Sequence, residues 1–228
     1  MTLSERLARV AELIPAGARL ADIGSDHAYL PVALASREAI EHAIAVEVAS
    51  GPYAAAQRTV REQAVEQRVS VRQANGLFGV QADDRLTAIS LCGMGGETIR
   101  DILQAGHARL NGRERLVMQP NGGEQALRQW LMEQGYRIVA EQVLREHRFD
   151  YEIIVAEPSG PVAYSERELY FGPLLMQARS EAFIHKWQRM LRQRHQTLAN
   201  FARAKQAVPA AKLEQVKLHI QWISELLG

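Results

Sequence analysis

Five short apolar segments recur in the first half of the chain, and a stretch with helical spacing follows most of them. The expected strands span residues 19–23, 43–48, 69–73, 86–91 and 116–119. Expected helices span residues 3–14, 29–37, 51–67, 96–105 and 124–134. Strands that alternate with helices pair in parallel, and the helices cover both faces of the sheet. The sequence therefore predicts an α/β fold around a parallel sheet.

The spacing changes in the second half. Residues 136–144 and 149–156 follow one another closely, which predicts two antiparallel strands at one edge of the sheet. Two later stretches, 184–201 and 213–227, carry apolar residues at steps of three and four on either side of Pro209. That spacing predicts two helices packed as an antiparallel, C-terminal α-helical coiled-coil hairpin.

We expect the chain to divide into a first domain over residues 1–160 and a C-terminal helical domain over residues 161–228. Charge divides in a similar way, because residues 1–164 carry a net charge of −4 and residues 165–228 one of +5. A basic tail on an acidic body predicts that the tail contacts a polyanion. The cations expected there are Lys186, Arg189, Arg192, Arg203 and Lys205. The alternative is a solvated helical face without such a partner.

Polar residues and glycines collect where the expected parallel strands end. They are Asp22, Gly24, Glu47, Asn75, Cys92, Gly93, Gln119 and Asn121. Ligands of open α/β sheets bind beyond the carboxyl ends of the strands. The sequence therefore predicts a single binding site at that edge of the sheet.

The segment that begins at Asp22 is typical of a nucleotide-type cofactor site. Gly24 lets the backbone approach a ligand closely, and Glu47 at the end of the next strand can accept hydrogen bonds from ribose hydroxyls. A dinucleotide site would have two further glycines, but Asp26 and Ala28 stand at those positions, and a carboxylate repels phosphate. A cofactor with a ribose and a positive charge but no phosphate fits better, and S-adenosylmethionine is such a cofactor.

Four segments also carry a resemblance to a known family. They read Asp22-Ile23-Gly24-Ser25-Asp26-His27-Ala28-Tyr29-Leu30-Pro31, Cys92-Gly93-Met94-Gly95-Gly96-Glu97-Thr98-Ile99, Gln119-Pro120-Asn121 and Tyr151-Glu152-Ile153. Their order and spacing across the whole chain, with the helical tail, resemble those of the bacterial tRNA (adenine-22 N1)-methyltransferases. The resemblance implies a Rossmann-like methyltransferase fold, S-adenosyl-L-methionine as the cofactor, tRNA as the partner and N1 of adenosine 22 as the target.

The resemblance also implies cofactor contacts. It places Asp22 near the methionine part of the cofactor and Glu47 on the ribose hydroxyls. Asn75 stands where many methyltransferases bind the adenine amine, and its side-chain oxygen can accept that hydrogen bond, although a pure turn role with Gly76 is the alternative. The full set of expected cofactor-binding residues is Asp22, Gly24, Ser25, Glu47, Val48, Asn75, Gly76, Cys92, Gly93 and Met94.

Two segments supply the residues expected to act on the target base, and these are Asp26, His27, Tyr29, Gln119 and Asn121. The Asp26 carboxylate can attract the sulfonium and stabilise a cationic product. His27 could move a proton and Tyr29 could stack on a base, but a surface histidine and a half-buried tyrosine are the commoner cases. Gln119 and Asn121 offer amides to the Watson–Crick edge of a base, or they simply form a proline turn.

The end of the fourth expected strand indicates which atom is methylated. Enzymes that methylate exocyclic amines usually carry Asp/Asn-Pro-Pro-aromatic there, whereas this chain has Leu91-Cys92-Gly93-Met94. A ring nitrogen such as adenine N1 already offers a lone pair, so alignment of nucleophile, methyl and sulfur is most of the catalysis. Cytosine C5 methyltransferases use a cysteine here as a covalent nucleophile, but theirs follows a proline. We favour a small buried residue as the interpretation of Cys92.

The amino-acid composition argues against several other classes of protein and of binding site. The single cysteine excludes an internal disulfide and a cysteine-rich zinc site, and no metal is expected. No run of about 18 apolar residues and no apolar leader occurs, so we expect a cytoplasmic protein with no membrane partner. A cofactor-sensing RNA-binding module without turnover and a nicotinamide-dependent reductase are the alternatives from other classes. The oligomeric state stays open between a monomer and a weak dimer.

Overall fold

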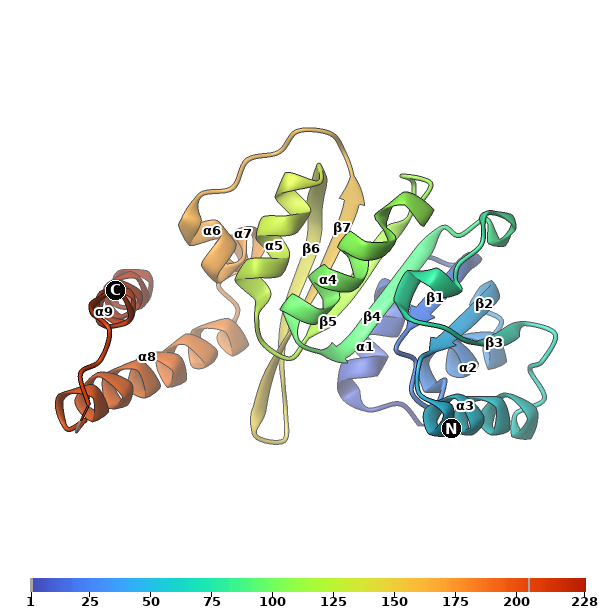
Figure 1. Ribbon diagram of the computed structural model, residues 1–228, viewed down its shortest axis with the longest axis horizontal. Coiled ribbons are helices and arrows are strands. Elements are labelled where there is room, and N and C mark those ends of the chain that lie inside the picture. Colours follow the sequence, from blue (N-terminus) through green and yellow to red (C-terminus); the bar gives the residue numbers. More distant parts are fainter. Residues whose placement is uncertain (1, 205) are drawn as a thin grey trace. The chain divides into compact units, whose positions relative to one another are not determined.

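The computed structural model describes residues 2–204 and 206–228, which fold into two compact units, Met1–Leu174 and Leu175–Gly228. In the described part of the first unit, seven strands form one sheet in the order β3-β2-β1-β4-β5-β7-β6 (Figure 1). The strands are β1 (Ala18–Ile23), β2 (Ile40–Glu47), β3 (Val69–Gln73), β4 (Ala88–Met94), β5 (Arg115–Pro120), β6 (Tyr136–Glu146) and β7 (Phe149–Pro158). β1 to β5 pair in parallel, whereas β7 runs antiparallel to both β5 and β6. The predicted parallel sheet with an antiparallel edge is therefore confirmed.

Helices cover both faces of this sheet. Those of the first unit are α1 (Glu5–Leu13), α2 (Tyr29–Ser36), α3 (Ser50–Glu62), α4 (Gly96–Gly106), α5 (Glu124–Glu133) and α6 (Glu166–Phe171). Successive strand side chains point to opposite faces. Leu20 of β1 accordingly packs in the core beneath α1, α2 and α3, while its neighbour Ala21 packs in the core beneath α4 and α5. The strand ends are left uncovered between these layers, where loops can build a site.

Helix ends follow local sequence signals. Ser4 caps α1, since its hydroxyl accepts a hydrogen bond from Leu7 N at 3.3 Å. The sequence predicted that the helix after β2 would run to residue 67, but α3 ends at Glu62. The reason is local, because Ala64 adopts a left-handed backbone with φ 51° and the chain turns there.

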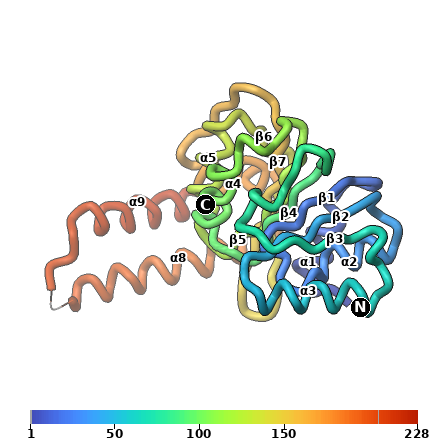
Figure 2. The backbone as a smooth tube through the Cα atoms, turned by 45° about the vertical axis from the view of Figure 1, so that its right-hand side comes forward, coloured from blue at the N-terminus to red at the C-terminus, as the bar shows by residue number. Residues whose placement is uncertain are grey.

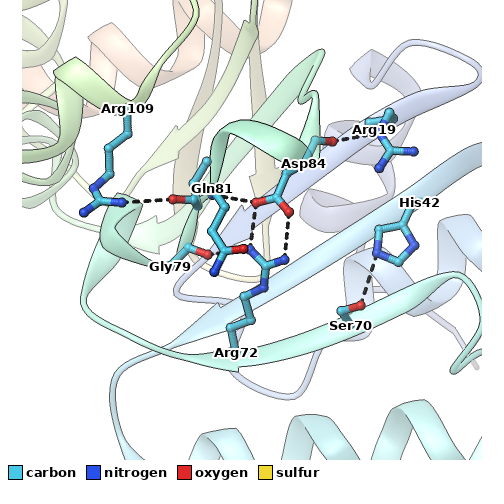
Figure 3. A network of polar contacts seen from close by, with 9 residues as sticks. Arg19, His42, Ser70, Arg72, Gly79, Gln81, Asp84 and Arg109 are labelled. Atoms are coloured by element: carbon cyan, nitrogen blue, oxygen red, sulfur yellow. Dashed lines mark hydrogen bonds and ion pairs between the residues drawn. The ribbon is translucent and has the colours of Figure 1, made fainter.

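The connection from β3 to β4 contains two 3₁₀ turns that the sequence did not predict, η1 (Gly76–Gly79) and η2 (Ala82–Asp84). Nη1 and Nη2 of Arg72 each donate to the Asp84 carboxylate at 2.7 Å, and Gln81 N donates to it at 2.7 Å (Figure 3). Burial alone would raise the pKa of Asp84, but these hydrogen bonds and the charge of Arg72 lower it. A charged network therefore holds this connection in one conformation.

The second unit is helical, with α8 (Glu181–Ala202) and α9 (Ala210–Leu227) following α7 (Pro173–Ala178), which crosses into it. α8 and α9 contact each other and run in opposite directions (Figure 2). Arg179 Nη1 donates to Leu226 O at 2.8 Å, which ties the end of α9 to the start of α8. Among the described helices, none combines the length and the apolar character that a membrane crossing requires.

The units divide at Leu174, later than the boundary after residue 160 that the sequence suggested. α6 belongs with the first unit because Arg128 of α5 donates to Leu169 O at 3.2 Å. Phe171 at the end of α6 is 1% exposed. The change in sequence composition thus precedes the structural boundary by one short helix.

Candidate active site

Asp22 lies near the end of β1 and is 4% exposed. Ser90 Oγ of the neighbouring β4 donates to its Oδ1 at 2.6 Å, and Ser25 Oγ donates to its Oδ2. Burial raises the pKa of Asp22, and the two hydroxyl hydrogen bonds offset only part of that effect. The carboxyl group therefore joins two strand ends to the glycine turn and carries little hydration of its own.

The turn after β1 folds against the end of β2. Gly24 N and Ser25 N both donate to Val46 O, at 2.9 and 3.2 Å. Gly24 has a φ of 70°, and a Cβ there would lie 2.7 Å from Met94 Cε. Glycine is therefore favoured at this position by its backbone conformation, and the flexible Met94 side chain lies directly over it.

The loop that leads into α2 presents polar side chains to solvent. Asp26 and Ala28 have positive φ values of 53° and 58°, a conformation that costs energy in residues with a Cβ. His27 Nε2 lies 3.6 Å from Asp26 Oδ1, and the rings of His27 and Tyr29 stack with centroids 5.1 Å apart. This strained loop places a carboxylate, an imidazole and a phenol where a large substrate can reach them.

Glu47 ends β2 and is 9% exposed. Its Oε2 is buried and has no hydrogen-bond partner among the described residues. Burial raises the pKa of Glu47, and the charges of Asp26 and Asp22 raise it further. A buried carboxylate oxygen without a donor is costly, so the position fits a ligand that brings hydroxyl donors. The next residue, Val48, is 61% exposed and offers apolar surface beside it.

The turn at Asn75 lines a cavity, and this turn follows directly on Ala74, whose N donates to Glu47 O at 2.9 Å. The volume of the cavity is about 240 Å³, and its lining is Asn75, Gly76, Phe78, Thr98, Asp101, Ile102 and Ala105. Gly76 has a φ of 55°, and a Cβ there would meet Ile102 Cγ2 at 2.9 Å. A lining of aromatic, aliphatic and amide groups suits a flat heteroaromatic ring. Phe78, Thr98 and Ile102 were not predicted as site residues.

Cys92 lies near the end of β4. Burial raises the pKa of its thiol, and the charge of Asp22 adds to that effect more than the charge of Arg6 reduces it. The sulfur is therefore held as a thiol and not as the thiolate that nucleophilic attack requires. The following Gly93 has a φ of 76°, and the pairing of β4 with β5 shifts register between Cys92 and Met94.

Glycines also join the loops after β4 and β5. Gly96 N donates to Gly122 O at 2.7 Å. A Cβ at Gly96 would overlap Gly123 O, and one at Gly123 would overlap Glu97 Oε2. The two loops are therefore in direct backbone contact and behave as one piece.

Gln119 is fully buried, and its amide is engaged within the protein. Its Oε1 accepts hydrogen bonds from Arg6 and from Gly93 N, the latter at 3.2 Å. Its Nε2 donates to Pro120 O at 2.8 Å and to Asn121 Oδ1 at 3.1 Å. The expectation that Gln119 reads a base edge directly is not supported, because both ends of its amide are occupied. Asn121 is exposed at the end of the strand.

Arg6 is a site residue that sequence reasoning missed. It comes from α1, 113 positions before Gln119 in sequence, and its guanidinium also lies 5.2 Å from the ring centroid of Tyr151. An arginine on an amphipathic helix has the sequence signature of an exposed surface residue, so nothing in the pattern pointed to this contact.

The predicted cofactor residues do come together. They follow the carboxyl ends of β1, β2, β3 and β4, which are neighbours in the sheet. The charges of Asp22 and Asp26 both act on Glu47 there. A negatively charged edge of this kind can attract a cationic nucleoside.

Residues 20–225 match the sequence profile of the family described as tRNA (adenine(22)-N(1))-methyltransferase. The Bacillus subtilis (strain 168) protein of that name is 40% identical over 192 residues, which cover 82% of this chain and 80% of the relative.

Solved structures of other proteins are similar to this chain over its whole length. The Bacillus subtilis M1A22 tRNA methyltransferase TrmK is 34% identical with a TM-score of 0.91, and the match covers 100% of this chain and 99% of that one. A Streptococcus pneumoniae protein solved in complex with S-adenosyl-L-methionine is 38% identical with a TM-score of 0.91, and the match covers 100% of both chains.

Proposed function

The chain belongs to the tRNA (adenine(22)-N(1))-methyltransferase family, and we propose that its active site is the edge of the sheet formed by the ends of β1, β2, β4 and β5. It is an S-adenosylmethionine-dependent enzyme that methylates N1 of adenosine 22 in tRNA. The observation that carries the proposed site is Glu47, whose buried Oε2 has no partner among the described residues. Ribose hydroxyls would supply the missing donors.

With the ribose bound at Glu47, the adenine and methionine parts of the cofactor can be placed as well. Its adenine enters the cavity that Phe78 and Asn75 line, with the Asn75 amide in reach of the adenine amine. Its methionine part lies over the Gly24 turn, where glycine allows close approach. The charges of Asp22 and Asp26 favour the positive sulfur and amine.

The chemistry asks for little from protein side chains beyond alignment. When bound, S-adenosylmethionine supplies an electrophilic methyl group; the lone pair of adenine N1 forms the new bond, and the carbon–sulfur electron pair stays on sulfur. N1 carries no proton in neutral adenine, so the site needs no general base. The product base is a cation, and the exposed Asp26 carboxylate stabilises that charge as it develops.

The base must leave its stack to reach this site. An adenine that is paired or stacked in folded tRNA hides N1, so local extrusion precedes transfer. The stacked His27 and Tyr29 rings lie on the exposed loop beside Asp26 and offer a flat surface to an extruded base.

The second unit holds the tRNA backbone. We infer that α8 and α9 form the coiled-coil hairpin that the sequence predicted, with Arg189, Arg192 and Arg203 as phosphate contacts. Lys186 is 7% exposed, with its ammonium 5.3 Å from the Trp187 ring centroid, so it is no longer assigned to phosphate. Lys205 lies outside the described residues. A tRNA substrate also favours the cytoplasm as the site of action.

A covalent cytosine C5 mechanism is the rival chemistry, and Cys92 separates the two. That mechanism requires a thiolate, whereas burial raises the pKa of this thiol. Direct transfer to a ring nitrogen does not use the sulfur at all.

The test incubates the protein with unmodified tRNA and methyl-labelled S-adenosylmethionine, followed by nucleoside analysis and mapping of the labelled position. We expect 1-methyladenosine at position 22, from both the wild type and Cys92→Ser. Labelled 5-methylcytidine, together with an inactive Cys92→Ser protein that still folds, would replace the proposed chemistry with the covalent one.

A further inference from the structure

Arg6 reaches from α1 to the end of β5 and is fixed there by three contacts. Nη1 donates to Gln119 Oε1, Nε lies 3.9 Å from Glu146 Oε2, and the guanidinium carbon lies 5.2 Å from the Tyr151 ring centroid. The positive Arg6 guanidinium cannot stabilise the positive charge that develops on the methylated base. Any contribution of Arg6 to catalysis therefore comes from the groups that it orients.

Two donors, Arg6 and Gly93 N, set the orientation of the Gln119 amide, and Arg6 is the charged one of the two. A guanidinium and a backbone N–H can only donate, so the Gln119 atom that meets both Arg6 and Gly93 N must be the oxygen. Nε2 then faces Pro120 O at 2.8 Å and Asn121 Oδ1 at 3.1 Å. A flipped amide would set donors against donors and acceptors against acceptors.

Gln119 in turn orients Asn121. Since Gln119 Nε2 can only donate, the Asn121 atom 3.1 Å away must be the oxygen. The Asn121 Nδ2 therefore occupies the amide position that does not face Gln119, and Asn121 as a residue is exposed. The backbone is fixed as well, because Asn121 N donates to Met94 O at 2.8 Å.

We propose that Arg6 is a positioning residue: through Gln119 it holds the Asn121 amide with Nδ2 toward the target adenine. There Nδ2 donates to a ring nitrogen other than N1, whose lone pair must stay available for the new bond. The inference rests on the proposed active site and adds a donor with a fixed direction to it. Such a contact keeps N1 in line with the methyl group, so its loss lowers kcat more than it raises KM.

The experiment compares Arg6→Met with Arg9→Met, which removes an exposed arginine of the same helix that pairs only with its neighbour Glu12 in the described contacts. We measure kcat and KM on tRNA, S-adenosylmethionine affinity and thermal unfolding. Arg6→Met should lower kcat about tenfold, the usual scale for one lost hydrogen bond, with little change in cofactor affinity. Arg6→Lys, which keeps a donor, should restore most of the loss, and Arg9→Met should match the wild type.

A double-mutant cycle with Asn121→Ala tests the route. Arg6→Met should cause no further loss in an Asn121→Ala background, because both changes remove the same contact. Asn121→Asp, which keeps the inward oxygen but loses the donor, should be as slow as Asn121→Ala. The inference would be overturned by any of three results. These are a double mutant in which the two kcat losses multiply, an Asn121→Asp protein with wild-type activity, and an Arg6→Met protein as fast as Arg9→Met. The proposed function stands or falls separately, on the wild-type product.

Discussion

At the residue scale, the proposed site depends on one carboxylate oxygen, Glu47 Oε2, which has no hydrogen-bond partner among the described residues. Glu47 is buried near Asp22 and Asp26, and all three effects raise its pKa. In the ligand-free protein the raised pKa means that ionised Glu47 opposes folding; this penalty is full above the folded-state pKa, shrinks as pH falls below it, and is gone below the unfolded-state pKa. Binding reverses the balance, because ribose hydroxyls donate best to the ionised group.

Cofactor affinity should therefore depend on pH through Glu47. The dissociation constant for S-adenosylmethionine should rise as pH falls, starting at a higher pH than for an ordinary glutamate. Glu47→Gln should lose about 1–3 kcal/mol of binding at neutral pH and show a flatter pH profile. Ligand-free Glu47→Gln should also unfold at a higher temperature than the wild type. Calorimetry and thermal unfolding check both, with exposed Glu41→Gln as the control; a pH-independent wild-type affinity would contradict the assignment.

Sequence reasoning reached some of these residues and not others for a physical reason. Asp22, Glu47 and Asn75 follow strand ends, and the topology of a parallel sheet brings such ends together whatever the side-chain detail. Arg6 meets Gln119 across 113 positions through side-chain reach alone, which no periodicity encodes. The Gln119 oxygen is occupied in part through that same contact.

At the scale of elements, hydrophobic spacing predicted the parallel sheet, the helices on both its faces and the antiparallel edge pair, whereas it did not predict connections that lack such spacing. η1 and η2 are held by Arg72, Gln81 and Asp84 (Figure 3), and the sequence there has no helical or strand period. Short polar turns of this kind depend on partners distant in space, so they escape a local pattern.

A buried ion cluster joins α5, β6 and β7. Arg128 is fully buried; its Nε donates to Glu141 Oε1 at 2.8 Å, and its Nη2 donates to Glu152. Burial raises the pKa of Glu141, although the charge of Arg128 acts in the opposite direction. The cation is thus what allows two carboxylates to share this interior.

Arg128→Met should cost about 3–5 kcal/mol of stability at neutral pH, because it leaves two buried carboxylates without their cation. The deficit relative to the wild type should shrink as pH falls, since protonation relieves the uncompensated charge. Urea unfolding at two pH values measures both effects, with exposed Arg137→Met on β6 as the control. A loss no larger than that of the control would show that the cluster contributes nothing.

At the scale of the whole molecule, charge separates along the chain, with +5 on residues 165–228 against −4 before them. Replacing Arg192 and Arg203 by glutamine should weaken tRNA binding at low salt and reduce the salt slope by about one for each phosphate that is no longer neutralised. Cofactor affinity should not change. The matched control replaces exposed Arg58 and Arg61 of α3 and alters net charge equally. Equal effects from both pairs would mean that net charge, not the helical tail, governs tRNA affinity.

The glycine contact between the loops after β4 and β5 bears on how substrate preference could be redesigned. Gly96 N donates to Gly122 O and a Cβ at Gly96 would overlap the Gly123 backbone, while Gly122 and Gly123 have φ values of 103° and 76°, so substitutions at these three positions strain this edge. An engineered variant should therefore exchange the loops after β4 and β5 together or leave both intact.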